Sequence, residues 1–153
     1  MATEMLYPAT CLYLDLGSEG QGAIALCGVS GSGKSDLAYR MIEKGALLVS
    51  DDQTQLCLKH GQLIADSAPH IAGCLEVRGV GIVKMPTIKS VPLKLHVNLQ
   101  DKPSLIERLP ENGMEDILGC QIPTVDLYPF EDSAPLKLQL IFKTVFNPAL
   151  LVD

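Results

Sequence analysis

The sequence predicts an α/β fold: a P-loop-containing domain in which a mostly buried mixed sheet is flanked by helices. Two continuous apolar runs, at residues 23–27 and 46–49, are typical of strands that are buried on both faces. Between these runs, apolar side chains recur at helical spacing: Leu37, Ala38, Met41 and Ile42. A glycine-rich segment joins the first run to this helix, with the pattern Gly28-x-x-x-x-Gly33-Lys34-Ser35. Strand, P-loop, helix and strand therefore follow one another, as they do in α/β proteins.

The expected helix begins at Lys34 and carries its charges in the order that the helix dipole favours. Asp36 lies in its first turn, Arg40 lies nearer its end, and Gly45 is a natural stop. Because a crossover through a helix joins parallel strands, we expect the two flanking strands to be parallel in one sheet. In such sheets ligands bind at the carboxyl ends of the strands.

The remaining elements are expected from local patterns: a strand at 11–16, a hairpin at 55–59 and 62–65, a half-exposed or edge strand at 91–99, a loop with short helical turns at 100–119, a weak strand at 122–127, and a final helix that starts near Ser133. No internal repeat, linker or low-complexity segment interrupts these elements. We therefore expect a single domain over residues 1–153.

Composition excludes several classes of function. Hydrophobic residues make up 47% of the 153 residues and charged residues 20%, which is ordinary for a globular protein. The net charge of -6 argues against a nucleic-acid partner. No apolar run is long enough to span a membrane, and the N-terminus has no signal-peptide pattern, so no membrane partner is expected. Five scattered cysteines with no zinc spacing indicate reduced thiols in the cytoplasm.

The P-loop predicts a phosphate-binding site. Its residues are Gly28, Val29, Ser30, Gly31, Ser32, Gly33, Lys34 and Ser35. Glycines allow backbone N–H groups to face phosphate oxygens, and the helix N-terminus adds partial positive charge. Lys34 supplies a cation for the β- and γ-phosphates, and the Ser35 hydroxyl can bind Mg²⁺. The pattern therefore indicates a nucleotide such as ATP.

An acidic pair, Asp51 and Asp52, ends the second buried strand. By the parallel arrangement, this pair reaches the same rim of the sheet as the P-loop. A carboxylate there can hold Mg²⁺ or accept a proton from an attacking hydroxyl. Asp51 follows Lys34 by only 17 positions. In most P-loop enzymes the acidic strand end comes much later, so this spacing is unlike that of GTPases or helicases.

A third polar element is the segment Glu76-Val77-Arg78-Gly79-Val80-Gly81. In a strand, Glu76 and Arg78 would point the same way and place a carboxylate beside a guanidinium. Such a pair suits a metal or phosphate neighbour, and the glycines allow close approach of a ligand. An ordinary surface ion pair is the alternative.

Together these segments resemble the catalytic domain of HPr kinase/phosphorylase. The P-loop of that family, Gly-x-Ser-Gly-x-Gly-Lys-Ser, matches residues 28–35, and its strand ending in Asp-Asp matches Asp51 and Asp52. Its second signature, Leu-Glu-x-Arg-Gly-x-Gly, matches residues 75–81. The segment Asp126-Leu-Tyr-Pro-Phe-Glu-Asp-Ser-Ala-Pro is similar to the C-terminal part of the short proteobacterial members, which lack the N-terminal domain.

The resemblance implies a P-loop kinase fold and a cytoplasmic enzyme that uses ATP and Mg²⁺ to phosphorylate a serine of HPr, the phosphocarrier protein of the sugar phosphotransferase system. The family also removes that phosphate by attack of inorganic phosphate, and its members assemble as hexamers. The implied catalytic residues are Asp51 as base, Lys34 as stabiliser of the transferring group, and Arg78 beside the phosphates or the partner. The implied metal-binding residues are Ser35 and Glu76, and Asp52 is a further candidate as part of the acidic pair.

One departure from the family concerns a histidine that usually precedes the P-loop near the catalytic aspartate. Here Pro8 or Thr10 falls at that position, and the three histidines of the chain, His60, His70 and His96, are expected to be structural or surface residues. We therefore regard the kinase direction as better supported than the phosphorylase direction. Two alternatives stay open: a P-loop kinase of a small metabolite, and a nucleotide-sensing binding module that has lost catalysis.

Overall fold

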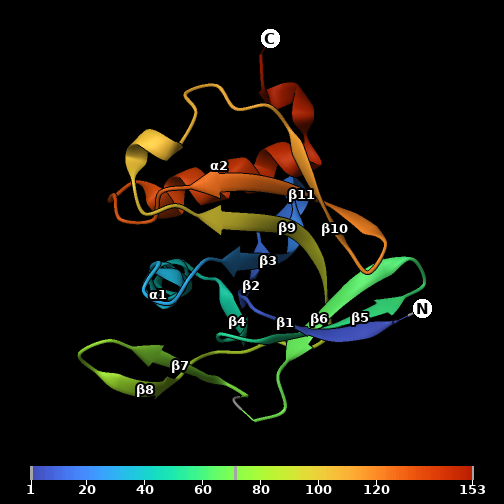
Figure 1. Ribbon diagram of the computed structural model, residues 1–153, viewed down its shortest axis with the longest axis vertical. Coiled ribbons are helices and arrows are strands. Elements are labelled where there is room, and N and C mark those ends of the chain that lie inside the picture. The colour runs from blue at the N-terminus through green and yellow to red at the C-terminus, as the bar shows by residue number, and fades with distance from the viewer. Residues whose placement is uncertain (1, 71, 153) are drawn as a thin grey trace.

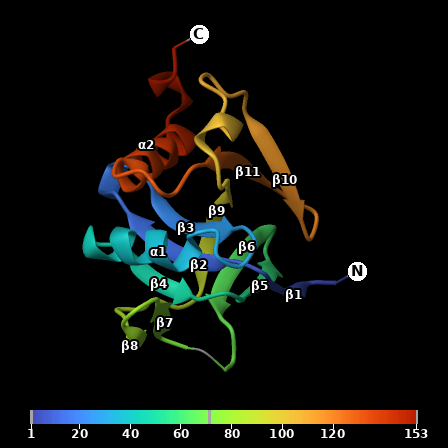
Figure 2. The same ribbon diagram turned by 60° about the vertical axis from the view of Figure 1, so that its left-hand side comes forward.

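The computed structural model describes residues 2–70 and 72–152, and Figures 1 and 2 show its elements. The strands are β1 (Glu4–Tyr7), β2 (Thr10–Asp15), β3 (Gln21–Cys27), β4 (Leu47–Ser50), β5 (Thr54–Lys59), β6 (Gln62–Ser67), β7 (Cys74–Val77), β8 (Gly81–Lys84), β9 (Val91–Leu99), β10 (Gly113–Ile117) and β11 (Cys120–Leu127). The helices are α1 (Lys34–Glu43) and α2 (Ala134–Phe146). Short 3-10 turns lie at η1 (Gly17–Glu19), η2 (Pro103–Leu105) and η3 (Pro148–Leu150).

Within the described residues, nine strands form one mixed sheet, and β7 and β8 form a separate hairpin. The order along the main sheet is β1-β5-β6-β9-β3-β2-β4, and β11 pairs with β9 and carries β10 beside it. Strands β3 and β11 are both parallel to β9, whereas β6 is antiparallel to it. The predicted mixed sheet with helices is confirmed.

The unit of strand, P-loop, helix and strand has the predicted geometry. Strand β2 lies between β3 and β4 and is antiparallel to both, so β3 and β4 run in the same direction. Their carboxyl ends reach one rim, where the P-loop follows β3 and Asp51 follows β4. Helix α1 begins at Lys34, as predicted, and ends just before Gly45, which has a φ of 103° that favours glycine.

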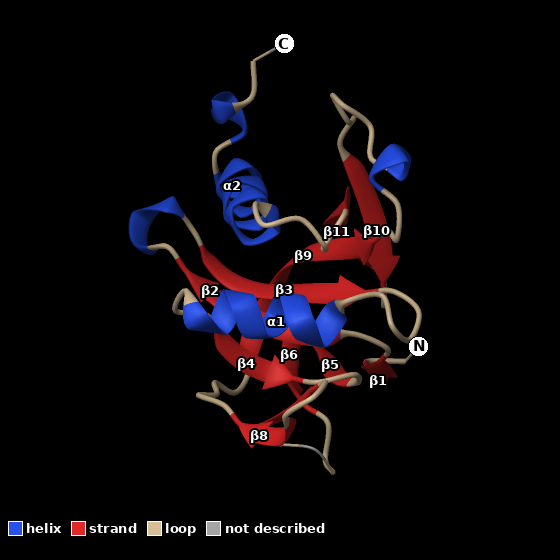
Figure 3. Ribbon diagram, turned by 90° about the vertical axis from the view of Figure 1, so that its left-hand side faces the viewer, coloured by secondary structure: helices blue, strands red, loops and turns tan. Residues whose placement is uncertain are grey.

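Helices α1 and α2 share one apolar core against the sheet (Figure 3). Leu37 and Met41 of α1 and Leu138 and Phe142 of α2 are fully buried in this core. A second cluster gathers apolar residues of β2 and β3 together with those of β5 and β6. The sheet itself therefore covers the side that the helices leave open, which explains why β3, at its centre, is apolar and buried at nearly every position.

Helix α2 starts where the sequence predicts, with Ser133 before it and Pro135 in its first turn. Its 13 residues bury one side, while Leu136 and Leu140 on the other side are more than half exposed. Across residues 2–70 and 72–152, no helix is both long enough and apolar enough to cross a membrane.

Two expectations differ from the structure. Of the two placements predicted for β9, the edge position is wrong, because β3 pairs with it on one side and β6 and β11 pair with it on the other. The half-exposed placement agrees with the partial exposure of Pro92, Lys94 and Asn98, which alternate with buried residues. Residues 100–119 contain the expected turn η2 and also strand β10, which was not predicted. Its sequence has little strand propensity, and pairing with β11 through a turn with positive φ at Leu118 and Gly119 imposes the extended form.

Candidate active site

The segment between β3 and α1 has the backbone of a phosphate cradle. Gly31 and Gly33 have φ values of 83° and 94°, a conformation that other residues rarely adopt. Successive N–H groups in such a turn can face one anion. Gly33 also caps α1 and has no side chain to satisfy the first-turn N–H groups, which leaves them for a ligand.

Ser32 supplies a second sign that this loop fits phosphate. It is only 5% exposed, and its hydroxyl is the buried side-chain polar atom that, among the described residues, has no hydrogen-bond partner. A buried hydroxyl without a partner costs about 1–3 kcal/mol, so a ligand oxygen at this point would be stabilising. A Cβ atom at Gly28 would lie 2.5 Å from the Ser32 Oγ atom, so only glycine leaves room there.

Lys34 lies against the backbone of the P-loop. Its Nζ atom donates hydrogen bonds to the carbonyl oxygens of Gly28, at 2.6 Å, and Val29, at 3.4 Å. Burial raises the pKa of Cys27, the last residue of β3, to about 12, although the positive charge of Lys34 acts in the opposite direction. The thiol therefore stays neutral and adds no negative charge beside the phosphate cradle.

Asp51 is the point at which the predicted site residues meet. It is 8% exposed, and its Oδ1 atom accepts hydrogen bonds from the Ser35 hydroxyl at 3.1 Å and the Thr10 hydroxyl at 3.0 Å. Its Oδ2 atom accepts a hydrogen bond from the backbone N–H of Glu76 at 3.1 Å. The P-loop helix, β2, β4 and the β7–β8 hairpin thus converge on one carboxylate.

The other predicted residues are exposed: Asp52 and Glu76, which adjoin Asp51, and Arg78, which is two residues beyond Glu76. Strand β7 ends at Val77, so Arg78 lies in the turn before β8 and does not share a strand with Glu76 as expected. Gly79, with a φ of 86°, shapes that turn. The expected side-by-side arrangement of the two side chains on one strand is therefore wrong.

The oxygen atoms beside Asp51 fit Mg²⁺. Magnesium prefers oxygen ligands and usually takes one or two carboxylates, with phosphates and waters completing its shell. The Ser35 hydroxyl lies 3.1 Å from the Asp51 Oδ1 atom at the mouth of the P-loop, and two further acidic residues adjoin Asp51: Asp52 follows it in the chain, and the Glu76 backbone N–H donates to it. Within the described residues, no three His, Cys, Asp or Glu side chains are grouped to hold a metal by themselves. A metal at this point would therefore need phosphate oxygens as further ligands.

Sequence reasoning gave no role to the contacts that hold α1 in place. Arg40 donates hydrogen bonds to the carbonyl oxygens of Pro129 and, at 3.2 Å, Glu131. This contact brings Phe130 over the P-loop, where a Cβ atom at Gly33 would lie 3.0 Å from its ring. The only sequence signal was the similarity of this segment to the C-terminal part of the family, which carried no contact information.

Thr10 was named only as one of two positions where the family histidine would fall. It is fully buried, and besides its bond to Asp51 its Oγ1 atom accepts the backbone N–H of Asp52 at 3.2 Å. Pro8 is exposed, so Thr10 is the residue that lies beside the acidic pair. No local pattern could have shown this, because the contact depends on β2 lying next to β4.

His96 has a structural role, as expected. It is 3% exposed, and its ring nitrogens are hydrogen bonded to the Tyr7 hydroxyl at 3.0 Å and the Thr124 hydroxyl at 2.7 Å. Burial lowers the pKa of His96, against the nearby carboxylates of Glu115 and Asp126. Burial also raises the pKa of Tyr7 to about 12, so both partners are neutral near pH 7.

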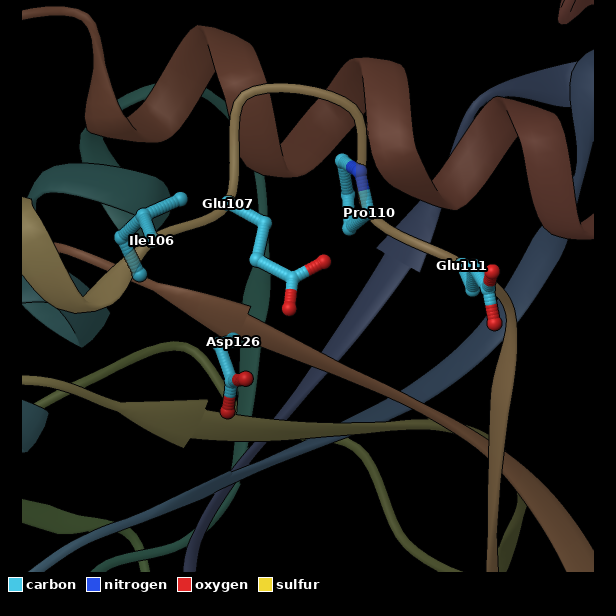
Figure 4. Close-up of a pocket in the computed structure, with 5 residues that line it drawn as sticks. All are labelled: Ile106, Glu107, Pro110, Glu111 and Asp126. Atoms are coloured by element: carbon cyan, nitrogen blue, oxygen red, sulfur yellow. The ribbon is translucent and has the colours of Figure 1, made fainter.

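A separate pocket lies beneath the loop between η2 and β10, at the carboxyl end of β11 (Figure 4). Ile106 and Pro110 line it together with the carboxylates of Glu107, Glu111 and Asp126. Three negative side chains disfavour a phosphate ligand, so this pocket does not compete with the P-loop for that role.

Comparison with known proteins identifies relatives of this chain. The family model described as the HPr Serine kinase C-terminal domain matches residues 19–136. An HPr kinase/phosphorylase of Clostridium tetani is 33% identical over 134 residues, which is 81% of this chain and 44% of that protein. One from Bordetella pertussis is 36% identical over 118 residues, which is 68% of this chain and 37% of that protein. This chain therefore spans less than half the length of these relatives.

A solved structure agrees. The Hpr(Ser) kinase/phosphatase from Coxiella burnetii superimposes with a TM-score of 0.74 at 28% sequence identity, covering 95% of this chain and 91% of that one. Both the fold and the sequence match extend over the P-loop, the acidic pair and the β7–β8 hairpin. This chain belongs to the HPr serine kinase C-terminal domain family.

Proposed function

We propose that this chain transfers the γ-phosphoryl group of ATP to a serine of the phosphocarrier protein HPr, in the cytoplasm. One observation carries the proposal: a buried carboxylate, Asp51, hydrogen bonds Ser35 of the P-loop helix and faces the same rim as the phosphate cradle. A base and a phosphate site within reach of each other are what transfer to a hydroxyl requires. The names of the relatives supply the substrate.

In this proposal each residue has a distinct task. The P-loop N–H groups and Lys34 hold the phosphates and offset the charge that spreads over the transferring group. Asp51 accepts the proton of the HPr serine hydroxyl. At the same time the serine oxygen bonds to the γ-phosphorus, and the bond between the γ-phosphorus and the oxygen that leaves with ADP breaks. Arg78 is exposed in the turn between β7 and β8, and its proposed task is to meet the phosphates or the partner.

Mg²⁺, when bound, would supply positive charge that offsets the negative charge of the phosphates. Ser35 is the proposed ligand from the P-loop, with Asp52 and Glu76 as the flanking carboxylates. Lys34 and Ser35 would orient the phosphates so that the γ-phosphorus faces Asp51.

The reverse reaction, release of the phosphate to inorganic phosphate, is proposed as the weaker direction. The reverse reaction needs Asp51 to return a proton. The residue beside it is Thr10, whose hydroxyl does not ionise near neutral pH, where the family usually has a histidine that can exchange protons.

We also propose a homo-oligomer, a hexamer by family resemblance, for which the exposed Leu136 and Leu140 of α2 offer an apolar surface.

The proposal is tested with labelled ATP, Mg²⁺ and three kinds of acceptor: HPr, HPr with its target serine changed to alanine, and small hydroxyl compounds. Label should appear only on HPr that keeps the serine. Lys34→Ala should lower turnover by about 100- to 1,000-fold, because the transition state loses a charge partner. Label on a small compound would favour a metabolite kinase. Tight binding of HPr without label would favour a binding module.

A further inference from the structure

We propose that Thr10 is a positioning residue for phosphoryl transfer: its single hydroxyl holds the Asp51 carboxylate and the Asp52 backbone at the same time. The inference rests on the proposed function, because it assigns to Asp51 the acceptance of the serine proton. Thr10 does not touch the substrate in this account and acts only through the two aspartates.

The hydroxyl of Thr10 has one orientation open to it. Its proton is donated to the Asp51 Oδ1 atom at 3.0 Å, and its oxygen accepts the Asp52 N–H at 3.2 Å. The side chain is fully buried, so water does not compete for either bond. A hydroxyl that donates to one group and accepts from the next residue fixes the direction in which the Asp51 carboxylate points.

The Thr10 hydroxyl is needed here because the backbone pairing between β2 and β4 is irregular at this point. The pairing of β2 with β4 shifts register between Cys11 and Leu12, next to the end of β4. Asp52 has a φ of 64°, so the chain turns sharply away as soon as Asp51 has been placed. The Thr10 side chain thus takes over where backbone hydrogen bonds between the strands stop.

Thr10 is itself held from its N-terminal side. The backbone N–H of Ala9 donates to the carbonyl oxygen of Tyr7 at 2.9 Å, which makes a tight turn between β1 and β2. The Tyr7 hydroxyl is anchored to the buried ring of His96 at 3.0 Å. Residues 7–10 are therefore fixed by hydrogen bonds to the rest of the sheet, so Thr10 can hold the Asp51 carboxylate to the accuracy that catalysis requires.

The experiment compares Thr10→Val with Thr10→Ser and with Thr144→Val as a matched control. Thr144 of α2 is partly buried, and its hydroxyl donates to the Ile141 carbonyl oxygen at 2.6 Å without touching either aspartate or residues 7–10. Thr10→Val should lower kcat for HPr phosphorylation by about 10- to 100-fold, because a small misplacement of the base is costly. KM for ATP should stay within about two-fold of wild type, because the P-loop is unchanged.

Thr10→Ser restores the hydroxyl and should return kcat to within about three-fold of wild type. Thr144→Val should keep kcat within the same range although it also removes a hydroxyl that makes a hydrogen bond. Hydrogen exchange gives a reading that does not depend on activity: the Asp52 amide should exchange faster in Thr10→Val and not in Thr144→Val, because only the former removes its acceptor. If Thr10→Val fails to fold, Thr10→Ala against Thr10→Ser makes the same comparison.

Three results would overturn the inference: full kcat in Thr10→Val, an equal loss in Thr144→Val, or no recovery in Thr10→Ser. A wild-type chain that leaves HPr unmodified would instead contradict the proposed function. The two failures are therefore distinguishable in one set of assays.

Discussion

At the scale of single residues, Gly33 must satisfy a backbone requirement and a packing requirement at once. Its φ of 94° lies in the left-handed region, and a Cβ atom would meet the ring of Phe130 at 3.0 Å and Pro129 at 3.1 Å. It also begins the turn from the P-loop into α1. Gly45, at the other end of α1, has a similar φ of 103° but no atom within 4 Å of a Cβ position.

This contrast gives a test that separates backbone strain from lost space. Gly45→Ala should cost about 1–2 kcal/mol of stability from the left-handed backbone alone. Gly33→Ala should cost more, because the 128–131 segment must also shift, and it should weaken nucleotide binding. Urea unfolding and titration with a fluorescent ATP analogue measure the two effects. Equal losses of stability and unchanged binding in both variants would contradict this account of Gly33.

His96 predicts how stability depends on pH. Its pKa in the folded state is lowered by burial from an ordinary value of 6.5, so the unfolded chain takes up a proton first as the pH falls. The contribution of neutral His96 is therefore complete above pH 6.5 and is lost as the pH falls from there to its folded-state pKa. Unfolding free energies of wild type and His96→Gln, measured from neutral to mildly acidic pH, should show a shallower slope for the variant. Parallel slopes would contradict this role.

The residue-level site was predictable where neighbours in sequence determined it. The P-loop pattern and the short spacing to Asp51 follow from one strand–helix–strand unit, so Ser35 and Asp51 could be placed at one rim. Thr10 could not, because its contact depends on β2 lying next to β4. Arg78 was placed on the wrong element because the glycines after it start a turn one residue earlier than the strand pattern suggested.

At the scale of elements, Arg40 joins α1 to the segment that leads into α2. Besides the carbonyl oxygens of Pro129 and Glu131, it pairs with Asp36 one helical turn away at 3.0 Å. Hydrogen bonds from a charged group to backbone carbonyls contribute more than an exposed ion pair. This contact keeps Phe130 over the P-loop.

Arg40→Ala should therefore destabilise the fold by about 1–3 kcal/mol and raise KM for ATP. Lys143→Ala is the matched control, since it removes a cation of α2 that forms an ion pair with the surface residue Glu19 at 3.4 Å. That variant should cost less than about 1 kcal/mol and leave KM unchanged. Thermal or urea unfolding with steady-state kinetics would measure both. Similar behaviour of the two variants would show that Arg40 has no special role in holding α1.

Elements with strong local periodicity were predicted well, and strands that become extended only by pairing with distant strands were not. Helix α1, the hairpin of β5 and β6, and the start of α2 all had clear patterns. Strand β1 was missed because its four residues become extended by pairing with β5, a contact between distant parts of the chain. The edge placement that the alternating pattern of β9 allowed is wrong, because its pairing with β3, β6 and β11 joins distant parts of the chain.

At the scale of the whole molecule, the site is assembled from parts that are widely separated in sequence. Asp51 gathers donors from positions 10, 35 and 76, and the segment at 129–131 holds the helix that carries one of them. The chain covers nearly all of the Coxiella burnetii structure, whereas it spans less than half of the curated relatives. We propose that the residues that converge on Asp51 form a site that can transfer a phosphoryl group to a protein serine.

The most direct test is the intact mass of HPr after incubation with this chain, ATP and Mg²⁺. The account predicts that HPr gains the mass of one phosphate, and that Asp51→Asn slows this gain by about 100- to 10,000-fold while still binding nucleotide. An unchanged mass of HPr with the wild-type chain, or the same rate of phosphorylation with Asp51→Asn, would contradict it.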